Sequence, residues 1–409
     1  MVNPPQEPRG GRLAAPRRRS GELRTGARQG TLREHNLSIV LERIVAAPEP
    51  VSRARIAADT GLTRGTVSAL VDRLVAAGLV TELEPVVGSG AGRPAVPLVP
   101  ARGTFVALGL EVNVDYAAVR GLDLAGRTVL EHVHDDDFRA SRPERALGVL
   151  LELAGTALAE VAALGARFAG ACLALPGLVD RRTGPLRVAP NLGWRDVDVL
   201  ALVGEHPVAE RELWLANEAN LAARAEATAR PELESFLYVS GEVGVGGAVV
   251  LGGELFPGSH GWSGELGHTL VPVDGHERQL EEVVGQDALV RAAGLGLAAG
   301  VPGLVAAAER GDERTLGVLA RAGDLLGLGV ANAVSVLDVE HVVLGGTYAA
   351  LEPWLRPGVE ARLQGVIGAP WAPVGLSAAQ AGPYPALTGG ALAVLRALVA
   401  DVQSVIAEL

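Results

Sequence analysis

Apolar positions at helical spacing predict three short helices near the start of the chain. The first helix has an apolar face made of Leu37, Val40, Leu41, Ile44 and Val45. Residues 51–80 then have the pattern of a helix, a tight turn and a second helix. Gly61 can take the left-handed conformation that ends a helix, and Thr63 can cap the next one. The second helix has an apolar stripe made of Val67, Leu70, Val71 and Leu74.

The outer face of this second helix is polar and basic, which is typical of a helix that lies in a DNA groove. Two short strands are predicted over residues 79–83 and 95–99, and the glycine-rich segment 87–94 between them ends in Arg-Pro. Together these features predict a winged helix-turn-helix, although an ordinary three-helix packing unit is the alternative. The predicted DNA-binding residues are Arg64, Thr66, Ser68, Arg73 and Arg93.

From about residue 104 onward, short apolar runs alternate with helical patterns. Strands are predicted at 105–112, 116–122, 129–132, 168–175, 212–216, 235–240, 246–251 and 341–344. Helices are predicted at 147–164, at 221–228 and repeatedly between 286 and 336. This alternation indicates an α/β fold of two lobes, with a cleft that is a natural ligand site. A closing helix at 391–406 is expected to pack on the first lobe, and the broken apolar runs predict no membrane span.

The charge of the chain is divided between its two parts. Residues 1–100 hold 14 arginines and nine acidic residues, a balance of +5, whereas the rest holds 22 arginines and 38 acidic residues, a balance of −16. A basic front can neutralise DNA phosphates. Residues 1–30 lack apolar periodicity and are predicted to be a disordered basic arm, either solvated or in contact with DNA. The single cysteine, Cys172, excludes a disulfide framework and fits a cytoplasmic protein.

Several motifs, in a fixed order, resemble the ROK family (repressor, open reading frame, kinase), and within it the N-acetylglucosamine and xylose repressor branch. They are GRPA at 92–95, LPGLVD at 175–180, PNLGW at 190–194, ANEAN at 216–220, SGEVGVGGAVVLGGEL at 240–255, GSHGWSGELGH at 258–268 and VVLGG at 342–346. The resemblance implies an actin-like, ribonuclease-H-like body with a sugar site in its cleft. Members are sugar kinases or sugar-responsive transcription factors.

The resemblance also implies a division of the chain. The winged helix-turn-helix is expected at 31–100 and the sugar-kinase-like body at 104–409. Within the body, the first lobe is expected at about 104–214, together with the C-terminal helix. The second lobe is expected at about 215–385.

Three departures from the family pattern predict a body that is not an enzyme. The first phosphate loop of the family runs Asp-x-Gly-Gly-Thr, but residues 111–115 read Glu-Val-Asn-Val-Asp. Glu218 stands in place of the aspartate base, and Val243 stands in place of a hydroxyl residue in the second loop. No catalytic residue and no cofactor is therefore expected.

The sugar site of the family is better preserved, because it needs carboxylates and amides that chelate hydroxyl groups. By resemblance, the effector-binding residues are Asn191, Asn217, Glu218, Glu265, His268 and Glu281. Many members follow the Gly-His motif with a cysteine cluster that binds zinc, but here only His268 and His276 remain. Since structural zinc needs four nitrogen or sulfur ligands, no metal is predicted.

The sequence therefore predicts a cytoplasmic, sugar-responsive regulator, most simply a repressor. Its expected partners are a double-stranded DNA operator, a sugar or sugar-phosphate effector, and a second copy of the chain in a homodimer or higher homo-oligomer. Two alternatives remain open at this point. One is an active sugar kinase that carries a DNA-binding domain, and the other is a DNA-binding scaffold that responds to no ligand.

Overall fold

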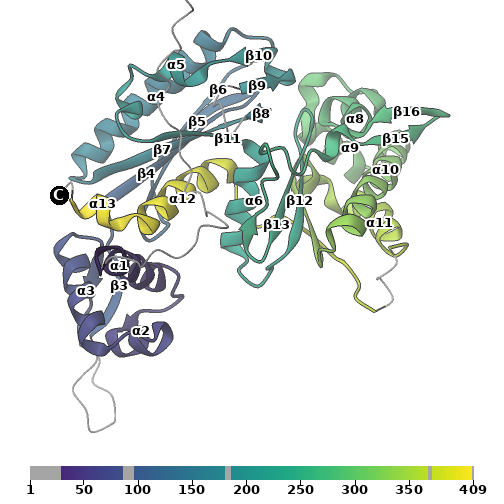
Figure 1. Cartoon of the computed structure of the whole chain (residues 1–409). Coiled ribbons are helices and arrows are strands. Elements are labelled where there is room, and N and C mark those ends of the chain that lie inside the picture. Colours follow the sequence, from purple (N-terminus) through teal and green to yellow (C-terminus); the bar gives the residue numbers. More distant parts are fainter. Residues whose placement is uncertain (1–28, 86–95, 180–185, 367–370, 408–409) are drawn as a thin grey trace, which may run out of the picture.

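A small N-terminal head sits under a two-lobed body in the computed structural model, which describes residues 29–85, 96–179, 186–366 and 371–407 (Figure 1). The head consists of α1 (Gln29–Val45), β1 (Val51–Ser52), α2 (Arg53–Thr60), α3 (Arg64–Ala76), β2 (Val80–Glu82) and β3 (Pro97–Pro100). Its strands pair in the order β1-β3-β2. Arg93 and most of the predicted arm lie outside the described residues.

Local capping explains where α2 and α3 begin and end. The Ser52 side chain accepts a hydrogen bond from the backbone of Arg55 at the start of α2, and Gly61 ends this helix with a φ of 70°. Thr63 caps α3 by accepting from the Thr66 amide. The predicted apolar stripe of α3 is fully buried, as Val67, Leu70, Val71 and Leu74 are all among the buried residues.

The first lobe is built on a five-stranded sheet. Its elements are β4 (Phe105–Val112), β5 (Tyr116–Asp123), β6 (Thr128–Asp135), α4 (Pro143–Ala163), β7 (Arg167–Leu175), β8 (Leu178–Val179), β9 (Leu186–Ala189), β10 (Trp194–Val197), α5 (Val199–Val203) and β11 (Leu213–Asn217). The sheet order is β11-β7-β4-β5-β6, in which β7 and β11 run parallel to β4 while β5 is antiparallel to both β4 and β6.

The second lobe repeats this topology. Its elements are β12 (Phe236–Gly241), β13 (Val245–Leu251), β14 (Glu254–Leu255), β15 (Leu270–Val273), β16 (His276–Gln279), α7 (Leu280–Val284), α8 (Gln286–Ala292), α9 (Gly300–Glu309), α10 (Glu313–Leu337), β17 (His341–Gly346), α11 (Thr347–Leu363) and β18 (Gly375–Ala378). The sheet order β14-β13-β12-β17-β18 has the same parallel and antiparallel pairings as the first. Two such sheets in tandem are the actin-like fold that the sequence predicted.

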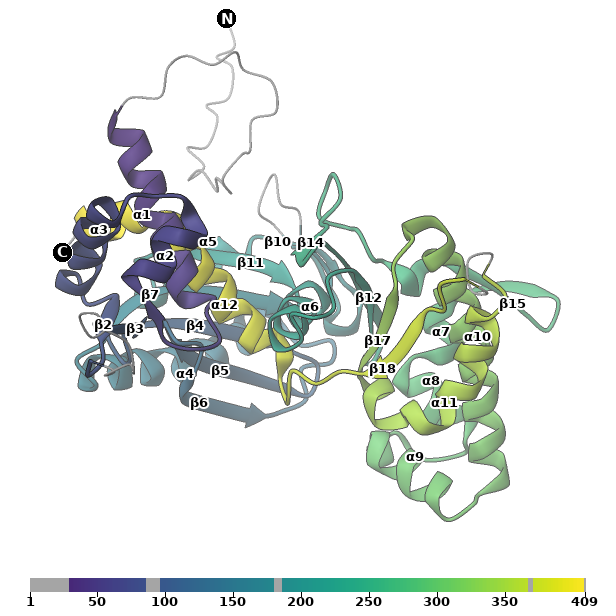
Figure 2. The ribbon, with the colours of Figure 1, turned by 90° about the horizontal axis from the view of Figure 1, so that it is seen from below.

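Two helices lie where the chain crosses between the lobes. The first, α6 (Glu218–Ala229), follows β11, so the first sheet extends to Asn217 rather than ending near the expected border at residue 214. The second, α12 (Pro385–Ala400), begins earlier than predicted and is followed by α13 (Val402–Ala407). Helix α12 packs against α6, β4 and β7, and it runs from the hinge toward the head (Figures 1 and 2).

Two helices of the body, α4 and α10, are long and apolar enough to cross a membrane by length and composition alone. The sequence prediction of no such segment overlooked them. In the structure, their apolar residues contribute to the packing of the body, because α4 covers β4 and β5 while α10 packs along α11.

Candidate functional site

The start of α3 presents the predicted DNA-reading surface. Arg64 is the first residue of the helix and is exposed, and Thr66 and Ser68 are half-buried on the following turn. The Thr66 hydroxyl lies 2.9 Å from the Thr63 hydroxyl, which ties this side chain to the cap of its own helix. Of these three predicted DNA contacts, Arg64 is therefore the most accessible to a DNA groove.

Arg73 has a different environment from the one expected. Its guanidinium Nη2 donates a 2.8 Å hydrogen bond to Gln403 Oε1 on α13, 330 residues away along the chain. Arg73 and Arg167 also line a shallow groove between the head and the body, together with Ile406. The structure thus gives Arg73 a role at the junction between head and body, a role that its position on the outer face of α3 did not indicate.

Most of the predicted effector residues come together on the second lobe and its hinge. His268 Nδ1 lies 3.9 Å from Glu281 Oε1, and His268 Nε2 lies 3.9 Å from Glu265 Oε2, so the imidazole sits between two carboxyl groups. A Cβ at Gly244 would lie 2.8 Å from Glu281 Oε2 and 3.3 Å from Asn191 Nδ2. Asn191 thus reaches the same place from the first lobe.

The side chain of Asn217 has a structural role. Its side-chain oxygen accepts from the Asn220 amide and caps α6, and its Nδ2 donates to the Gly177 carbonyl at 3.1 Å. With both ends of the amide occupied, Asn217 fixes the turn after β7 and the start of α6. This arrangement positions Glu218, the first residue of α6, with its Oε2 3.4 Å from Asn113 Nδ2 of the first lobe.

Glu218 belongs to a cluster of carboxyl groups with Glu111 on β4, which is buried, and Glu242 at the start of the β12–β13 turn, which like Glu218 is half-buried. Burial is the main cause that raises the pKa of all three groups, to about 7 for Glu111 and about 8 for Glu242, and mutual repulsion adds to the effect on Glu218 and Glu242. The pKa of Glu265 is also raised, chiefly by burial and further by Glu281, while His268 opposes the rise.

In the segment that aligns with the first phosphate loop, the backbone amides are already hydrogen-bonded within the turn. Asn113 Oδ1 accepts a 2.6 Å hydrogen bond from the Val114 amide, and the Asn113 amide donates to the Tyr116 carbonyl. These are backbone amides that a phosphate-binding loop would direct at its ligand. Asp115 adds a carboxylate to the same turn, where it pairs with Arg139 at 2.6 Å.

The glycines of the second loop are needed for close packing. A Cβ at Gly247 would lie 2.4 Å from the Gly264 carbonyl oxygen, and one at Gly246 would lie 3.0 Å from the Ala219 Cβ. These glycines therefore let the loop approach the Gly-Glu-Leu-Gly-His segment and α6. Their presence indicates tight packing and does not indicate a surviving nucleotide site.

The segment where the sequence resemblance led us to look for a zinc site forms the β15–β16 hairpin. His276 begins β16, whereas His268 precedes β15 and faces Glu265 and Glu281. Among the described residues, no group of three or more histidine, cysteine or acidic side chains is arranged to hold a metal ion.

Sequence reasoning missed Glu242, although it lies inside a motif that was singled out. The prediction for this motif considered only its glycines and not the carboxyl group of Glu242 beside them. A Cβ at Gly346 would lie 2.5 Å from Glu242 Oε1, which places this carboxyl group between the two loops that end β12 and β17. The position of Glu242 directly after a predicted strand, inside a glycine-rich loop, is the signal that could have identified this residue.

The raised pKa of Glu242 makes the stability of the folded protein depend on pH. Between the ordinary pKa of 4.5 and the folded value of about 8, the folded protein binds more protons than the unfolded chain, so stability falls as pH rises through this range. Each pKa unit corresponds to about 1.4 kcal/mol. We expect Glu242→Gln to raise the free energy of unfolding at pH 8 by about 1 kcal/mol or more, and to lose this advantage toward pH 5.

Urea titrations at pH 5 and pH 8 measure this difference, with the exposed Glu309→Gln as the matched control. A Glu242→Gln protein that is no more stable than the parent at pH 8 would contradict the raised pKa of Glu242.

Comparisons with known proteins agree with this architecture. A model of the ROK family matches residues 108–397, and a model of the MarR family matches residues 38–88. The xylose repressor of Bacillus subtilis (strain 168) is 26% identical over 358 residues, which cover 84% of this chain and 91% of that protein.

Two solved structures show the same fold. A ROK family transcriptional regulator, a homologue of the E. coli MLC protein, superposes with a TM-score of 0.74 over 92% of this chain and 99% of its own, at 21% identity. The ROK hexokinase of Thermus thermophilus superposes with a TM-score of 0.56 over 70% of this chain and 97% of its own, at 30% identity. A winged helix-turn-helix followed by an actin-like body is therefore confirmed.

Proposed function

Because the chain belongs to the ROK family, we propose that it is a sugar-responsive transcriptional repressor that binds operator DNA through α3 and a sugar in the cleft of its body. The similarity to a xylose repressor supports this proposal, and D-xylose is the first sugar to test. Repression from a cytoplasmic homodimer would place two α3 helices on half-sites about 34–36 Å apart.

The proposal rests on a difference between the two sides of the kinase-like site. The groups that would bind a sugar are kept, whereas the loop that would bind phosphate is closed. On the sugar side, Glu265, His268 and Glu281 remain grouped within reach of Asn191. On the phosphate side, the Val114 amide donates its hydrogen bond to the Asn113 side chain. A site that keeps its hydroxyl-binding groups and closes its phosphate loop can bind a sugar without phosphorylating it.

The charge of the cleft narrows the class of effector. Glu242 and Glu218 lie at its base, and Glu265 and Glu281 lie at its sugar side. A bound phosphate group would require these neighbouring carboxyl groups to stay protonated, whereas neutral hydroxyl groups can donate hydrogen bonds to them in either state. We therefore propose a neutral sugar and not a sugar phosphate.

The DNA half of the proposal is tested by Arg64→Ala. If Arg64 reads a base edge, the variant loses roughly 1–3 kcal/mol of operator affinity and keeps its affinity for unrelated DNA. The operator is obtained by selecting from a random DNA library with the parent protein, and both affinities are measured by fluorescence anisotropy.

Arg195→Ala is the matched control, because Arg195 is exposed on β10, at the opposite side of the first lobe from the head (Figure 1). If Arg64→Ala binds the selected operator as tightly as this control does, α3 is not inserted in the groove as proposed.

A further inference from the structure

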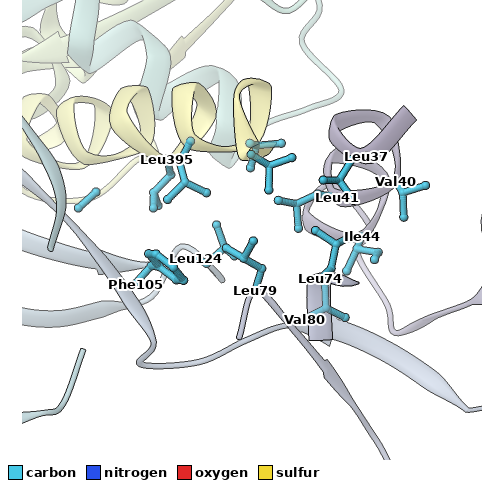
Figure 3. Close-up of a cluster of buried hydrophobic side chains, with 14 of the residues drawn as sticks. Leu37, Val40, Leu41, Ile44, Leu74, Leu79, Val80, Phe105, Leu124 and Leu395 are labelled. Atoms are coloured by element: carbon cyan, nitrogen blue, oxygen red, sulfur yellow. The ribbon is translucent and has the colours of Figure 1, made fainter. Parts of the chain in front are cut away.

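The hydrophobic core of the head is continuous with apolar residues of the C-terminal helices. Figure 3 shows Leu37 and Leu41 of α1 facing the helix that carries Leu395, with Leu79 and Leu124 between the head and the first lobe. All of these side chains are at most 4% exposed. A shared core of this kind fixes the orientation of the head relative to α12 and the first sheet.

Polar contacts hold the same junction. The Ser38 hydroxyl donates to the Ala400 carbonyl at 2.9 Å, at the last residue of α12. The Thr104 hydroxyl donates to the Gly78 carbonyl at 2.7 Å, between the end of α3 and the entry to β4. With the bond between Arg73 and Gln403, three hydrogen bonds tie the head to the body in addition to the core.

The other end of α12 is packed into the hinge between the lobes. A Cβ at Gly109 of β4 would lie 1.9 Å from the Leu387 carbonyl oxygen, and one at Gly389 of α12 would lie 1.8 Å from the Leu221 carbonyl oxygen of α6. Backbones this close cannot slide independently. A change in lobe angle that moves α6 must therefore move α12, and the head is attached to the far end of α12.

The residue just before α12 is in an unusual conformation. Tyr384 has a φ of 51° and a ψ of 55°, which is the left-handed region that non-glycine residues rarely adopt. Arg120 of β5 holds it there, since its Nη1 donates to the Pro383 carbonyl at 3.1 Å and to the Thr388 hydroxyl at 2.6 Å.

The Tyr384 ring contacts Tyr116, which is next to the carboxyl cluster. It meets the Tyr116 ring edge to face, with centroids 5.0 Å apart and planes at 70°. Tyr116 Oη donates a 2.7 Å hydrogen bond to Glu111 Oε1. Asn113 Nδ2 lies 3.3 Å from the same oxygen and 3.4 Å from Glu218 Oε2, so the contacts continue to a proposed effector ligand.

We propose that Tyr384 is a positioning residue that transmits the state of the cleft to the DNA-binding head through α12. The inference rests on the proposed function, because it describes how a bound sugar would act on DNA. Sugar bound at Glu218 shifts Asn113 and Tyr116, the Tyr116 ring moves Tyr384, and α12 carries this motion to α1 and α3. The differential affinity of the sugar for the two positions sets the size of the response.

The test compares Tyr384→Asn with Tyr384→Phe. Asparagine tolerates the left-handed conformation and removes the ring, whereas phenylalanine keeps the ring contact. For each variant, D-xylose binding is measured by calorimetry, and the dissociation constant for the selected operator is measured with and without D-xylose. Trp371→Ala is the control, because Trp371 is an exposed aromatic residue outside the hinge.

We expect Tyr384→Asn to bind D-xylose and operator within about threefold of the parent, while the ratio of operator dissociation constants with and without sugar falls from the 5–150-fold range toward 1. Tyr384→Phe and Trp371→Ala should keep the parent ratio. A Tyr384→Asn protein that keeps the full ratio overturns the proposal.

A measurement without sugar separates this inference from the proposed function. Hydrogen exchange at the α1 amides of Leu37–Ile44 should be at least fivefold faster in Tyr384→Asn than in Tyr384→Phe, because the head is held by α12. If the parent shows no sugar response but this exchange differs, the proposed function fails and the structural link stands. Equal exchange in the two variants overturns the link, whatever the sugar does.

Discussion

The purified protein is expected to show no sugar-dependent ATP hydrolysis or sugar phosphorylation. Phosphoryl transfer depends almost wholly on placing donors and cations around the transferring phosphate. Here the Val114 amide is occupied by the Asn113 side chain, and Asp115 and Glu242 bring carboxyl groups to the two loops. Kinases of ordinary activity turn over about 1–100 times per second, and we expect a rate at least a thousandfold below the lower value.

A coupled assay with ATP, Mg²⁺ and a panel of neutral sugars measures this rate, with the ROK hexokinase of Thermus thermophilus as the positive control. The similarity of that enzyme to this chain, 30% identity, makes the assay necessary. Turnover of about 1 per second with any sugar would establish the alternative function, a kinase that carries a DNA-binding head.

Glu265→Ala is expected to abolish the effect of sugar on DNA binding and to leave sugar-free DNA binding unchanged. Glu265 lies beside His268 and is about one-third exposed, so its removal opens no large cavity. It is also remote from the head, since it sits just before the 3₁₀ turn Leu266–His268, which packs on β13 and α7 of the second lobe. A lost hydrogen bond to a charged group costs about 1.5–3 kcal/mol, which lowers sugar affinity about 10–150-fold.

Operator titrations with and without D-xylose, on the parent, Glu265→Ala and the exposed Glu309→Ala, measure this effect. The Glu309 variant should respond like the parent. If Glu265→Ala responds as strongly as the parent at a sugar concentration equal to the dissociation constant of the parent, Glu265 is not an effector ligand, and the assignment of His268 and Glu281 weakens with it.

Periodicity and capping residues were sufficient to predict the head and most strands of the body. The stripe on α3, the cap at Thr63 and the turn at Gly61 depend on neighbours within a few residues, so they are visible in the sequence. Helix α11 is the contrasting case. It contains Pro353 and Pro357, which interrupt the helical signal, and only packing against α10 and β17 shows that the helix continues through them.

Contacts between distant segments could not be predicted from one sequence. The pairing of Arg73 with Gln403 spans 330 positions, and it adds a contact with the body to a residue that the sequence predicted only as a DNA contact. Asn217 was predicted as an effector ligand, and in the structure its side chain caps α6. In both cases the residue type fits two roles, and only the three-dimensional neighbour decides between them.

The most direct test of the central claim is an operator titration of the parent protein at fixed salt, with and without D-xylose and a panel of other neutral sugars and sugar phosphates. The account predicts that at least one neutral sugar weakens operator binding 5–150-fold, while its phosphate ester has no effect at the same concentration. Operator affinity that no sugar changes, or that only sugar phosphates change, would contradict it.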